Sequence, residues 1–345
     1  MRSASAALVG LCCSAAAASE RKIITYIDTA GINWSAQPPI PIVDVAPTAY
    51  NVLHAGFFLP SLGKAYDFAS TLTNLDPAYG GKLIVESMHN ASKKVVLSVG
   101  GATETPQSAA YFTKNDPTRL AATVAKLVVD AGLDGVGIDW EDAYDNSNPG
   151  LTGYGVAATR KAGSGPAVAW LCTLTKALRK ALPAPRYLIS HAPQAPYFDL
   201  GYDAVHRNCG ADIDYYNVQF YNQGNYYVTA AGLIDKETIV PDKYPSCVSP
   251  WDGSIADIVA RGVPASKIVV GKIITAGDGN SGYVPLSSFG SFLGQALAKH
   301  PTLAGAFGWQ WGSDTTGTWG AAVKTAFKAA DEALAARNAT GEGSN

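Results

Sequence analysis

Two carboxylates stand at a spacing that suits acid catalysis in residues 133–142, which read Leu-Asp-Gly-Val-Gly-Ile-Asp-Trp-Glu-Asp. The apolar residues of this segment predict a strand that runs into a loop. Because side chains alternate along a strand, Gly137, Asp139 and Glu141 share one face. Two neighbouring carboxyl groups raise the pKa of one of them, and a carboxylic acid that keeps its proton near neutral pH can protonate a glycosidic oxygen. The alternative is a pair of acids in a solvated loop.

Short β-rich runs alternate with helical runs along most of the chain. The expected strands are 22–28, 51–59, 94–99, 135–140, 187–192, 215–221, 267–274 and 304–309, and the expected helices are 117–131, 167–182, 254–261, 287–299 and 320–336. Several strands are almost continuously apolar, as strands buried on both faces are. This order favours an α/β fold, a single (β/α)8 TIM barrel without a large α+β insertion. A doubly wound open sheet is the alternative, but no Gly-x-Gly-x-x-Gly turn opens its first helix.

In a barrel, the two carboxylates would lie close to the same end of the strand. The face that carries Asp139 points inward, and Glu141 falls at the C-terminal mouth, where barrel enzymes place their chemistry. An ionised, unpaired carboxylate on such a face is costly, so two of them on one strand need a functional reason.

The composition limits the class of partner. The chain has 345 residues and a net charge of -2, which offers no basic excess for a nucleic acid. Only 16% of the residues are charged, below the roughly 25% that is typical of soluble domains. Seven Trp and 17 Tyr offer flat faces on which sugars can stack, although core packing explains many such residues. We expect a neutral glycan substrate, a monomer, and no cofactor, metal ion or membrane partner.

Both ends of the chain differ from its centre. Arg2 precedes a short apolar run at residues 6–18, which predicts a secretory signal peptide at 1–19 and cleavage before Glu20. The run is too short to span a bilayer, so we expect an extracellular or cell-wall protein. The catalytic barrel is expected at 20–334 and a flexible polar tail at 335–345.

The expected mature chain keeps three cysteines, Cys172, Cys209 and Cys247. Cys209 and Cys247 lie in connecting sequence rich in Pro and Gly, so we expect a disulfide between them. Cys172 lies in an apolar helical run and is expected to be a buried free thiol.

The segment that begins at Asp134 resembles the Asp-Gly-x-Asp-x-Asp-x-Glu signature of glycoside hydrolase family 18, which includes chitinases and endo-β-N-acetylglucosaminidases. Residues 192–196, Ala-Pro-Gln-Ala-Pro, are similar to a segment of its plant and fungal class III chitinases. Other motifs that resemble the family's, each ending an expected strand, are Ser98-Val-Gly100-Gly101, Gln219-Phe-Tyr221-Asn222 and residues 305–309, which end in Trp309 and precede Asp314.

The resemblance implies a role for each matching residue. Glu141 would protonate the leaving oxygen, and Asp139 would hold the amide of the substrate N-acetyl group. Tyr221 would donate a hydrogen bond to the acetyl carbonyl, and Trp309 would form the apolar floor. The substrate acetamide, and no second protein carboxylate, would attack the anomeric carbon with retention of configuration. Further residues expected to contact the substrate are Tyr26, Ser98, Gly100, Gly101, Gln194, Gln219 and Asn222.

One position departs from the family pattern, because Gly137 stands where the family usually has an Asp. We expect Asp139 to lose a like-charged neighbour, and the interior to gain a gap that water can fill. Activity is expected to survive with an altered rate or pH optimum.

Three other features have alternative explanations. His191 ends a strand and is expected to be structural or part of a subsite, since no metal-ligand spacing surrounds it. The Gly-rich residues 277–282 lack the Glu of an EF-hand and the Lys of a P-loop, so a flexible loop is expected. Tyr226, Tyr227 and Trp251 are candidates for sugar stacking or for ordinary packing.

Three functions remain open on this sequence. The first is a secreted endo-acting chitinase with a shallow groove, because residues 275–303 are too few to include an extra α+β module. The second is an endo-β-N-acetylglucosaminidase that cuts the chitobiose core of N-glycans. The third is a chitin-binding protein with low turnover, which the presence of Glu141, Asp139 and Tyr221 together disfavours.

Overall fold

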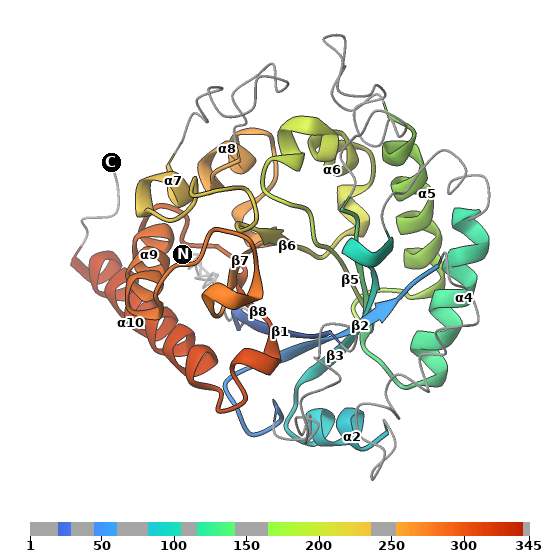
Figure 1. The fold of residues 1–345 in the computed structure, drawn as a ribbon, viewed down its shortest axis with the longest axis horizontal. Coiled ribbons are helices and arrows are strands. Elements are labelled where there is room, and N and C mark those ends of the chain that lie inside the picture. Colours follow the sequence, from blue (N-terminus) through green and yellow to red (C-terminus); the bar gives the residue numbers. More distant parts are fainter. Residues whose placement is uncertain are drawn as a thin grey trace, which may run out of the picture.

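Eight parallel strands close into a barrel (Figure 1). The computed structural model describes residues 20–28, 45–60, 82–104, 116–141, 165–235 and 253–340. Each strand pairs in parallel with the next, and the last pairs with the first. The strands are β1 Lys22–Asp28, β2 Val52–Phe58, β3 Lys94–Gly100, β4 Gly135–Asp139, β5 Leu188–His191, β6 Tyr215–Gln219, β7 Ile268–Ile273 and β8 Gly305–Trp309. The predicted barrel and all eight predicted strands are confirmed.

Helices surround the barrel (Figure 1). They are α2 Lys82–Asn90, α4 Pro117–Asp130, α5 Pro166–Ala181, α6 Asp203–Cys209, α7 Ala230–Ile234, α8 Ile255–Ala260, α9 Leu286–Lys299 and α10 Thr318–Thr340. Short 3₁₀ turns cover Ala102–Glu104, Gly210–Asp212, Ala265–Lys267, Ala276–Asp278 and Trp311–Ser313, and a π-helical segment covers Phe198–Tyr202. All five predicted helices are present. The sequence did not predict α2, α6 and α7, which are short.

Local signals start two of the helices. The Asp116 side chain accepts a hydrogen bond from the backbone N–H of Arg119, and Pro117 stands in the first turn of α4. Ser254 and Asp257 form a reciprocal capping box at the start of α8.

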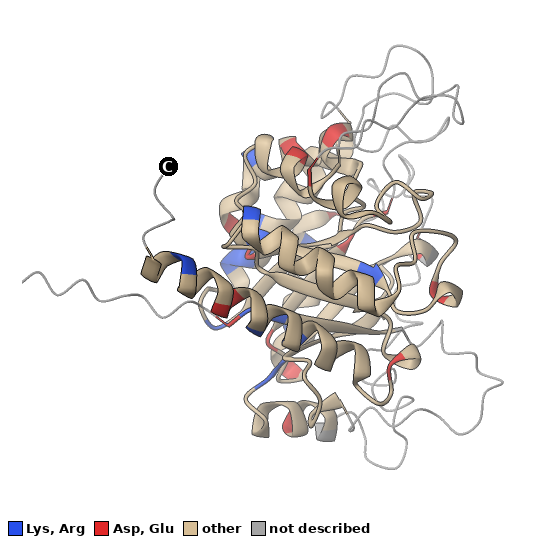
Figure 2. Cartoon of the chain, turned by 90° about the vertical axis from the view of Figure 1, so that its left-hand side faces the viewer, with Lys and Arg blue, Asp and Glu red and all other residues tan. Residues whose placement is uncertain are grey.

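The C-terminal helix is longer than the sequence predicted. α10 continues to Thr340, so residues 335–340 are helical where a flexible tail was expected. Ala and Arg in these turns favour a helix, and the polar composition reflects exposure. Figure 2 shows the last turns of α10 extending beyond the barrel.

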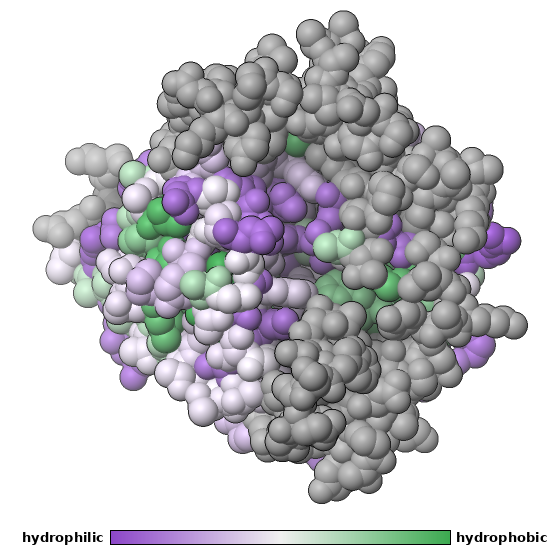
Figure 3. Space-filling view, viewed as in Figure 1, coloured by the Kyte–Doolittle hydropathy of each residue, from purple (hydrophilic) through white to green (hydrophobic). Residues whose placement is uncertain are grey.

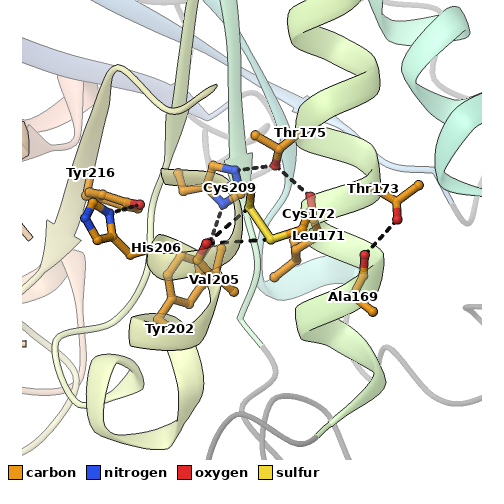
Figure 4. Close-up of a disulfide and its surroundings, with 11 residues drawn as sticks. Ala169, Leu171, Cys172, Thr173, Thr175, Tyr202, Val205, His206, Cys209 and Tyr216 are labelled. Atoms are coloured by element: carbon orange, nitrogen blue, oxygen red, sulfur yellow. Dashed lines mark hydrogen bonds between the residues drawn. A yellow bond between two sulfur atoms is a disulfide. The ribbon is translucent and has the colours of Figure 1, made fainter. Parts of the chain in front are cut away.

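One disulfide links two helices that cover neighbouring strands. Cys172 of α5 is bonded to Cys209 at the end of α6, with their Cα atoms 5.4 Å apart (Figure 4). The expected pairing of Cys209 with Cys247 and the expected free thiol at Cys172 are therefore wrong. The reason is tertiary, because packing of α5 on α6 brings together two cysteines 37 residues apart. Cys247 lies outside the described residues.

Asp134 anchors the bottom of the barrel, at the opposite end of β4 from Asp139. It accepts hydrogen bonds from Val95 N at 2.9 Å, His89 Nε2 at 2.8 Å and Lys94 Nζ at 3.1 Å. Burial opposes ionisation of this carboxyl, but the three hydrogen bonds outweigh it and lower the pKa of Asp134. The first Asp of the motif therefore fixes β4 against β3.

Among the described residues, no helix combines the length and the apolar character that a bilayer crossing needs. The predicted signal segment at 1–19 lies outside the described residues.

Candidate active site

Strand β4 delivers the two carboxylates to the mouth of the barrel. Val136 and Ile138 belong to the outer core, so Gly137 and Asp139 occupy the inner face. Asp139 ends the strand and is 5% exposed. Glu141 lies two residues further on, where it is partly exposed. The structure thus places one acid at the base of the site and the other at its rim.

Gln219 brings the two acids together. Its Nε2 lies 3.1 Å from Asp139 Oδ1, 3.3 Å from Glu141 Oε1 and 2.9 Å from the carbonyl oxygen of Ala192. The amide has only two hydrogens for these three acceptors, so it is shared among them. Because one amide reaches both carboxylates, they face the same point of the mouth, as their spacing predicted.

Gly100 and Gly101 lie against the backbone of Asp139. Gly101 N donates to the carbonyl oxygen of Asp139 at 2.9 Å. A Cβ on Gly100 would fall 2.3 Å from the same oxygen, and Gly100 has φ +102°. Only glycine permits this approach without strain. The structure shows that both glycines fix the end of β4, and their expected contact with the substrate stays a prediction.

Two buried phenols flank Asp139. Burial, followed by the charge of Asp139, raises the pKa of Tyr26 and of Tyr221 well above the usual value. Glu141 adds to the rise at Tyr221. Both phenols keep their protons at physiological pH and can donate hydrogen bonds to a substrate or to a carboxylate.

Aromatic rings form one wall of the mouth. Trp309, at the end of β8, is half-buried, with its ring centroid 5.7 Å from that of Tyr26 and 6.1 Å from that of Phe57. Trp309 therefore lies beside Tyr26 at the mouth of the barrel, and its role as the apolar floor stays a prediction. Phe57 was not predicted; its only signal is a ring at the end of a strand. In the space-filling view along the barrel, hydrophilic residues lie around the centre of the face (Figure 3).

Asn222 holds a loop. Its Oδ1 accepts from Asn280 N at 2.7 Å, and its N–H donates to the carbonyl oxygen of Ser281 at 3.0 Å. Asn222 has φ +64°, which Asn tolerates better than most residues. The Gly-rich loop predicted after β7 is present, and these bonds tie it to the end of β6. Asn222 therefore positions this loop, and its expected contact with the substrate stays a prediction.

A buried lysine supports the same region. Lys272 of β7 donates from Nζ to the carbonyl oxygens of Phe220 at 2.7 Å, Tyr227 at 2.6 Å and Gly282 at 3.2 Å. Burial lowers the pKa of Lys272 to about 7. Lys272 was not predicted as a site residue, and the only sign of it in the sequence is a single Lys in an otherwise apolar strand.

The remaining predicted residues lie near the acids. Gln194 is partly exposed and bridges to Gln219 through the backbone. Tyr197, which was not predicted, donates from its hydroxyl to the carbonyl oxygen of Glu141 and so holds the backbone of that residue. Ser98 is buried one layer deeper, with Oγ 3.3 Å from His54 Nδ1.

The gap expected at Gly137 does not exist. A Cβ at this position would fall 2.8 Å from His54 Cε1 and 3.0 Å from Ser190 Oγ. The imidazole of His54, which reaches in from β2, fills the space that was expected to hold water. Burial lowers the pKa of His54 to about 3, so the ring is neutral.

The structure places His191, Tyr226 and Tyr227, for which the sequence left two explanations each, in or against the packed interior. His191 is fully buried, with Nε2 3.0 Å from Thr175 Oγ1 of α5, so it is structural. Tyr227 is 2% exposed and belongs to the core, and Tyr226 is partly buried against that core. Trp251 lies outside the described residues.

Comparisons with known proteins agree on one family. The family model described as "Glycosyl hydrolases family 18" matches residues 32–282. Endochitinase 3 of Metarhizium anisopliae is 26% identical over 246 residues, which cover 67% of this chain and 69% of that protein. A GH18 chitinase from Pseudoalteromonas aurantia superposes with a TM-score of 0.65 at 25% identity, over 88% of this chain and 99% of that one. A fungal endo-β-N-acetylglucosaminidase of family 18 shares the fold, with a TM-score of 0.59 and 21% identity over 88% and 97% of the two chains.

Proposed function

Because this chain belongs to glycosyl hydrolases family 18, we propose that it cleaves internal β-1,4 links of chitin, with Glu141 as general acid and base. The observation that carries the proposal is the contact of one Gln219 amide with both Asp139 and Glu141. This contact places a partly exposed acid above a buried one, beside an aromatic wall. A glycosidic oxygen above the rim carboxyl would receive its proton.

The proposed first step breaks the bond between the anomeric carbon and the leaving oxygen. Glu141 transfers its proton to that oxygen while the acetamide oxygen of the same sugar bonds to the anomeric carbon. Asp139, which lies deeper, orients the amide N–H and stabilises the oxazolinium charge that develops. The protonated phenol of Tyr221 donates to the acetamide carbonyl, and the ring of Trp309 packs under the sugar.

In the proposed second step, water attacks the anomeric carbon and restores the acetamide. Glu141, now ionised, accepts the proton of that water. Two displacements at one carbon retain its configuration. The burial of Asp139 supports this assignment, because the buried acid suits orientation and the accessible one suits proton transfer.

A product analysis tests the proposal. The protein is incubated with chitin hexamers and, separately, with a high-mannose glycoprotein. The products are identified by mass, and the anomer that forms first is identified by proton NMR before mutarotation. Chitin fragments that appear first as the β-anomer are the expected result. A Glu141→Gln variant should lose activity by about 10²–10⁴-fold. Release of glycans that leave one GlcNAc on the protein would assign the endo-β-N-acetylglucosaminidase activity instead, and retention on chitin beads without products would indicate a binding protein.

Export and monomeric state are further parts of the proposal. Arg2 and the apolar residues 6–18 support removal of a signal peptide before Glu20. Recovery of the secreted protein with a first residue near Glu20 is the expected result, and a retained segment 1–19 would contradict it. Light scattering should give the mass of one chain.

A further inference from the structure

The side chain of His54 occupies the room that Gly137 leaves. A Cβ on Gly137 would lie 2.8 Å from His54 Cε1 and 2.9 Å from His54 Nδ1, closer than side chains approach. Strand β3 lies between β2 and β4, so the ring reaches across the barrel interior. The missing side chain at position 137 is therefore what admits the ring.

Small residues on neighbouring strands complete this space. Ser98 pairs with Gly137, and Gly137 pairs with Ser190, so two serines and a glycine stand in register on β3, β4 and β5. They lie one layer below the pair formed by Gly100 and Asp139. One imidazole fills the volume that these residues leave open, directly beneath the buried acid.

Hydrogen bonds connect the ring to the site. His54 Nδ1 lies 3.3 Å from Ser98 Oγ, and Nε2 lies 3.3 Å from Asn217 Nδ2. Asn217 Nδ2 donates to the Tyr26 hydroxyl oxygen at 2.6 Å. Because Asn217 donates to both groups, Nε2 is an acceptor, and the proton of the neutral ring stands on Nδ1. The phenol proton of Tyr26 is then available to another acceptor.

We propose that His54 is a positioning residue that supports Asp139 from below, in place of a carboxyl at position 137, through Asn217 and Tyr26. The inference rests on the proposed function, since it concerns the acid that holds the acetamide. Within the part of the chain that the structure describes, two titratable groups face the ring. They are Tyr26 of β1, whose ring centroid lies 4.6 Å away, and Tyr215 of β6, whose hydroxyl lies 3.1 Å from Nε2.

Of the described residues beneath Asp139, the titratable groups His54, Tyr26 and Tyr215 are all uncharged near neutral pH. Burial raises the pKa of both Tyr26 and Tyr215, so both phenols stay neutral. A carboxyl at position 137 would instead share a proton with Asp139 and couple the two titrations. In this chain the support of Asp139 comes from neutral hydrogen-bonding groups.

Steady-state kinetics of single variants test whether His54 supports Asp139. In His54→Leu the volume is kept and the hydrogen bonds are lost, so kcat should fall about tenfold, with KM changed much less. His54→Gln keeps an amide that reaches Asn217 and should recover most of the loss. His191→Leu is the matched control, because His191 is equally buried but lies on the outer face of β5. It should lower the melting temperature and leave kcat unchanged. A His54→Leu enzyme with the kcat and pH profile of the wild type would overturn the inference.

A double-mutant cycle tests whether His54 takes the space of an acidic side chain at position 137. Gly137→Asp alone should lower the melting temperature sharply, because the new side chain meets the imidazole. Adding His54→Ala should recover much of that loss, and the acidic limb of the pH–rate profile should move up by about one pH unit as the new carboxyl raises the pKa of the pair. Additive changes in melting temperature would overturn the pairing. If Gly137→Asp yields no folded protein in either background, the His54→Leu and His54→Gln kinetics decide.

The two proposals fail separately. Melting temperatures need no substrate, so the pairing of positions 54 and 137 is measured even in a protein that cleaves no chitin oligomer. Such a protein would overturn the proposed function, whereas an active enzyme with additive effects would overturn only the role of His54.

Discussion

Replacing Gly100 by Ala tests whether the approach of two backbones positions the buried acid. Gly100 has φ +102°, and a Cβ there would lie 2.3 Å from the carbonyl oxygen of Asp139. Gly132 is the matched control, since it has φ +70° and its Cβ would meet nothing within 4 Å. Both changes give Ala an unfavourable backbone conformation, and only the first adds a collision.

The control sets the scale of the backbone effect. A positive φ costs Ala about 1–2 kcal/mol, and the reduced freedom of the unfolded chain offsets about 0.4–1 kcal/mol of this. Gly132→Ala should therefore lose about 1 kcal/mol, which lowers the melting temperature by about 1–2 °C in a domain of this size.

The collision adds two further losses at Gly100. The contact is about 0.7 Å shorter than the 3.0 Å that a Cβ needs, so β3 and β4 must separate. Overpacking of this kind costs about 1–3 kcal/mol, and the hydrogen bond from Gly101 to Asp139 contributes about 1 kcal/mol. Gly100→Ala should thus lose about 3–5 kcal/mol in total.

Activity provides the sharper measurement. A shift of Asp139 by a fraction of an ångström should lower kcat on chitin oligomers by about 10–100-fold, while Gly132→Ala keeps the wild-type kcat. The assay is hydrolysis of a chitin oligomer beside thermal unfolding of all three proteins. Equal losses of stability and equal kcat in the two variants would refute the argument that Gly100 is required for the approach.

Three further predictions concern stability. Burial lowers the pKa of Lys272 to about 7, so between about pH 7 and pH 10 the unfolded chain holds a proton that the folded chain lacks. The free energy of unfolding should therefore rise with pH in that window. Denaturant unfolding should show this rise in the wild type, and Lys272→Met should flatten it. Asp134 has a lowered pKa, so its contribution to the free energy of unfolding is present above about pH 4 and is lost as the pH falls through its pKa in the folded protein. Asp134→Asn should cost about 1–2 kcal/mol of stability near neutral pH, and a cost that does not shrink in acid would contradict this. Replacing Cys172 and Cys209 by Ala removes a disulfide that spans 37 residues and should cost about 2–4 kcal/mol of stability. The melting temperature should fall while kcat at 25 °C stays unchanged, and an unchanged melting temperature would argue against the bond.

Local sequence determined much of the fold and the position of the acids. Short β-rich runs predicted the eight strands, and several of them are almost continuously apolar because strands buried on both faces must be apolar. Side-chain alternation placed Asp139 and Glu141 on one face. The ends of the strands predicted the approximate positions of Tyr221 and Trp309, since the carboxyl ends of parallel strands meet at one mouth.

The tertiary structure decided which groups stand between those ends. His54 fills the place of Gly137 across an intervening strand, and Cys172 finds Cys209 across a helix interface. Lys272 supports the end of β6 through carbonyl oxygens, which no side-chain pattern records. Periodicity reports which face a residue takes on its own element, whereas these contacts depend on how separate elements pack. The sequence therefore placed Glu141 and Asp139 at the mouth, and only the packed barrel decided that a neutral imidazole lies beneath them.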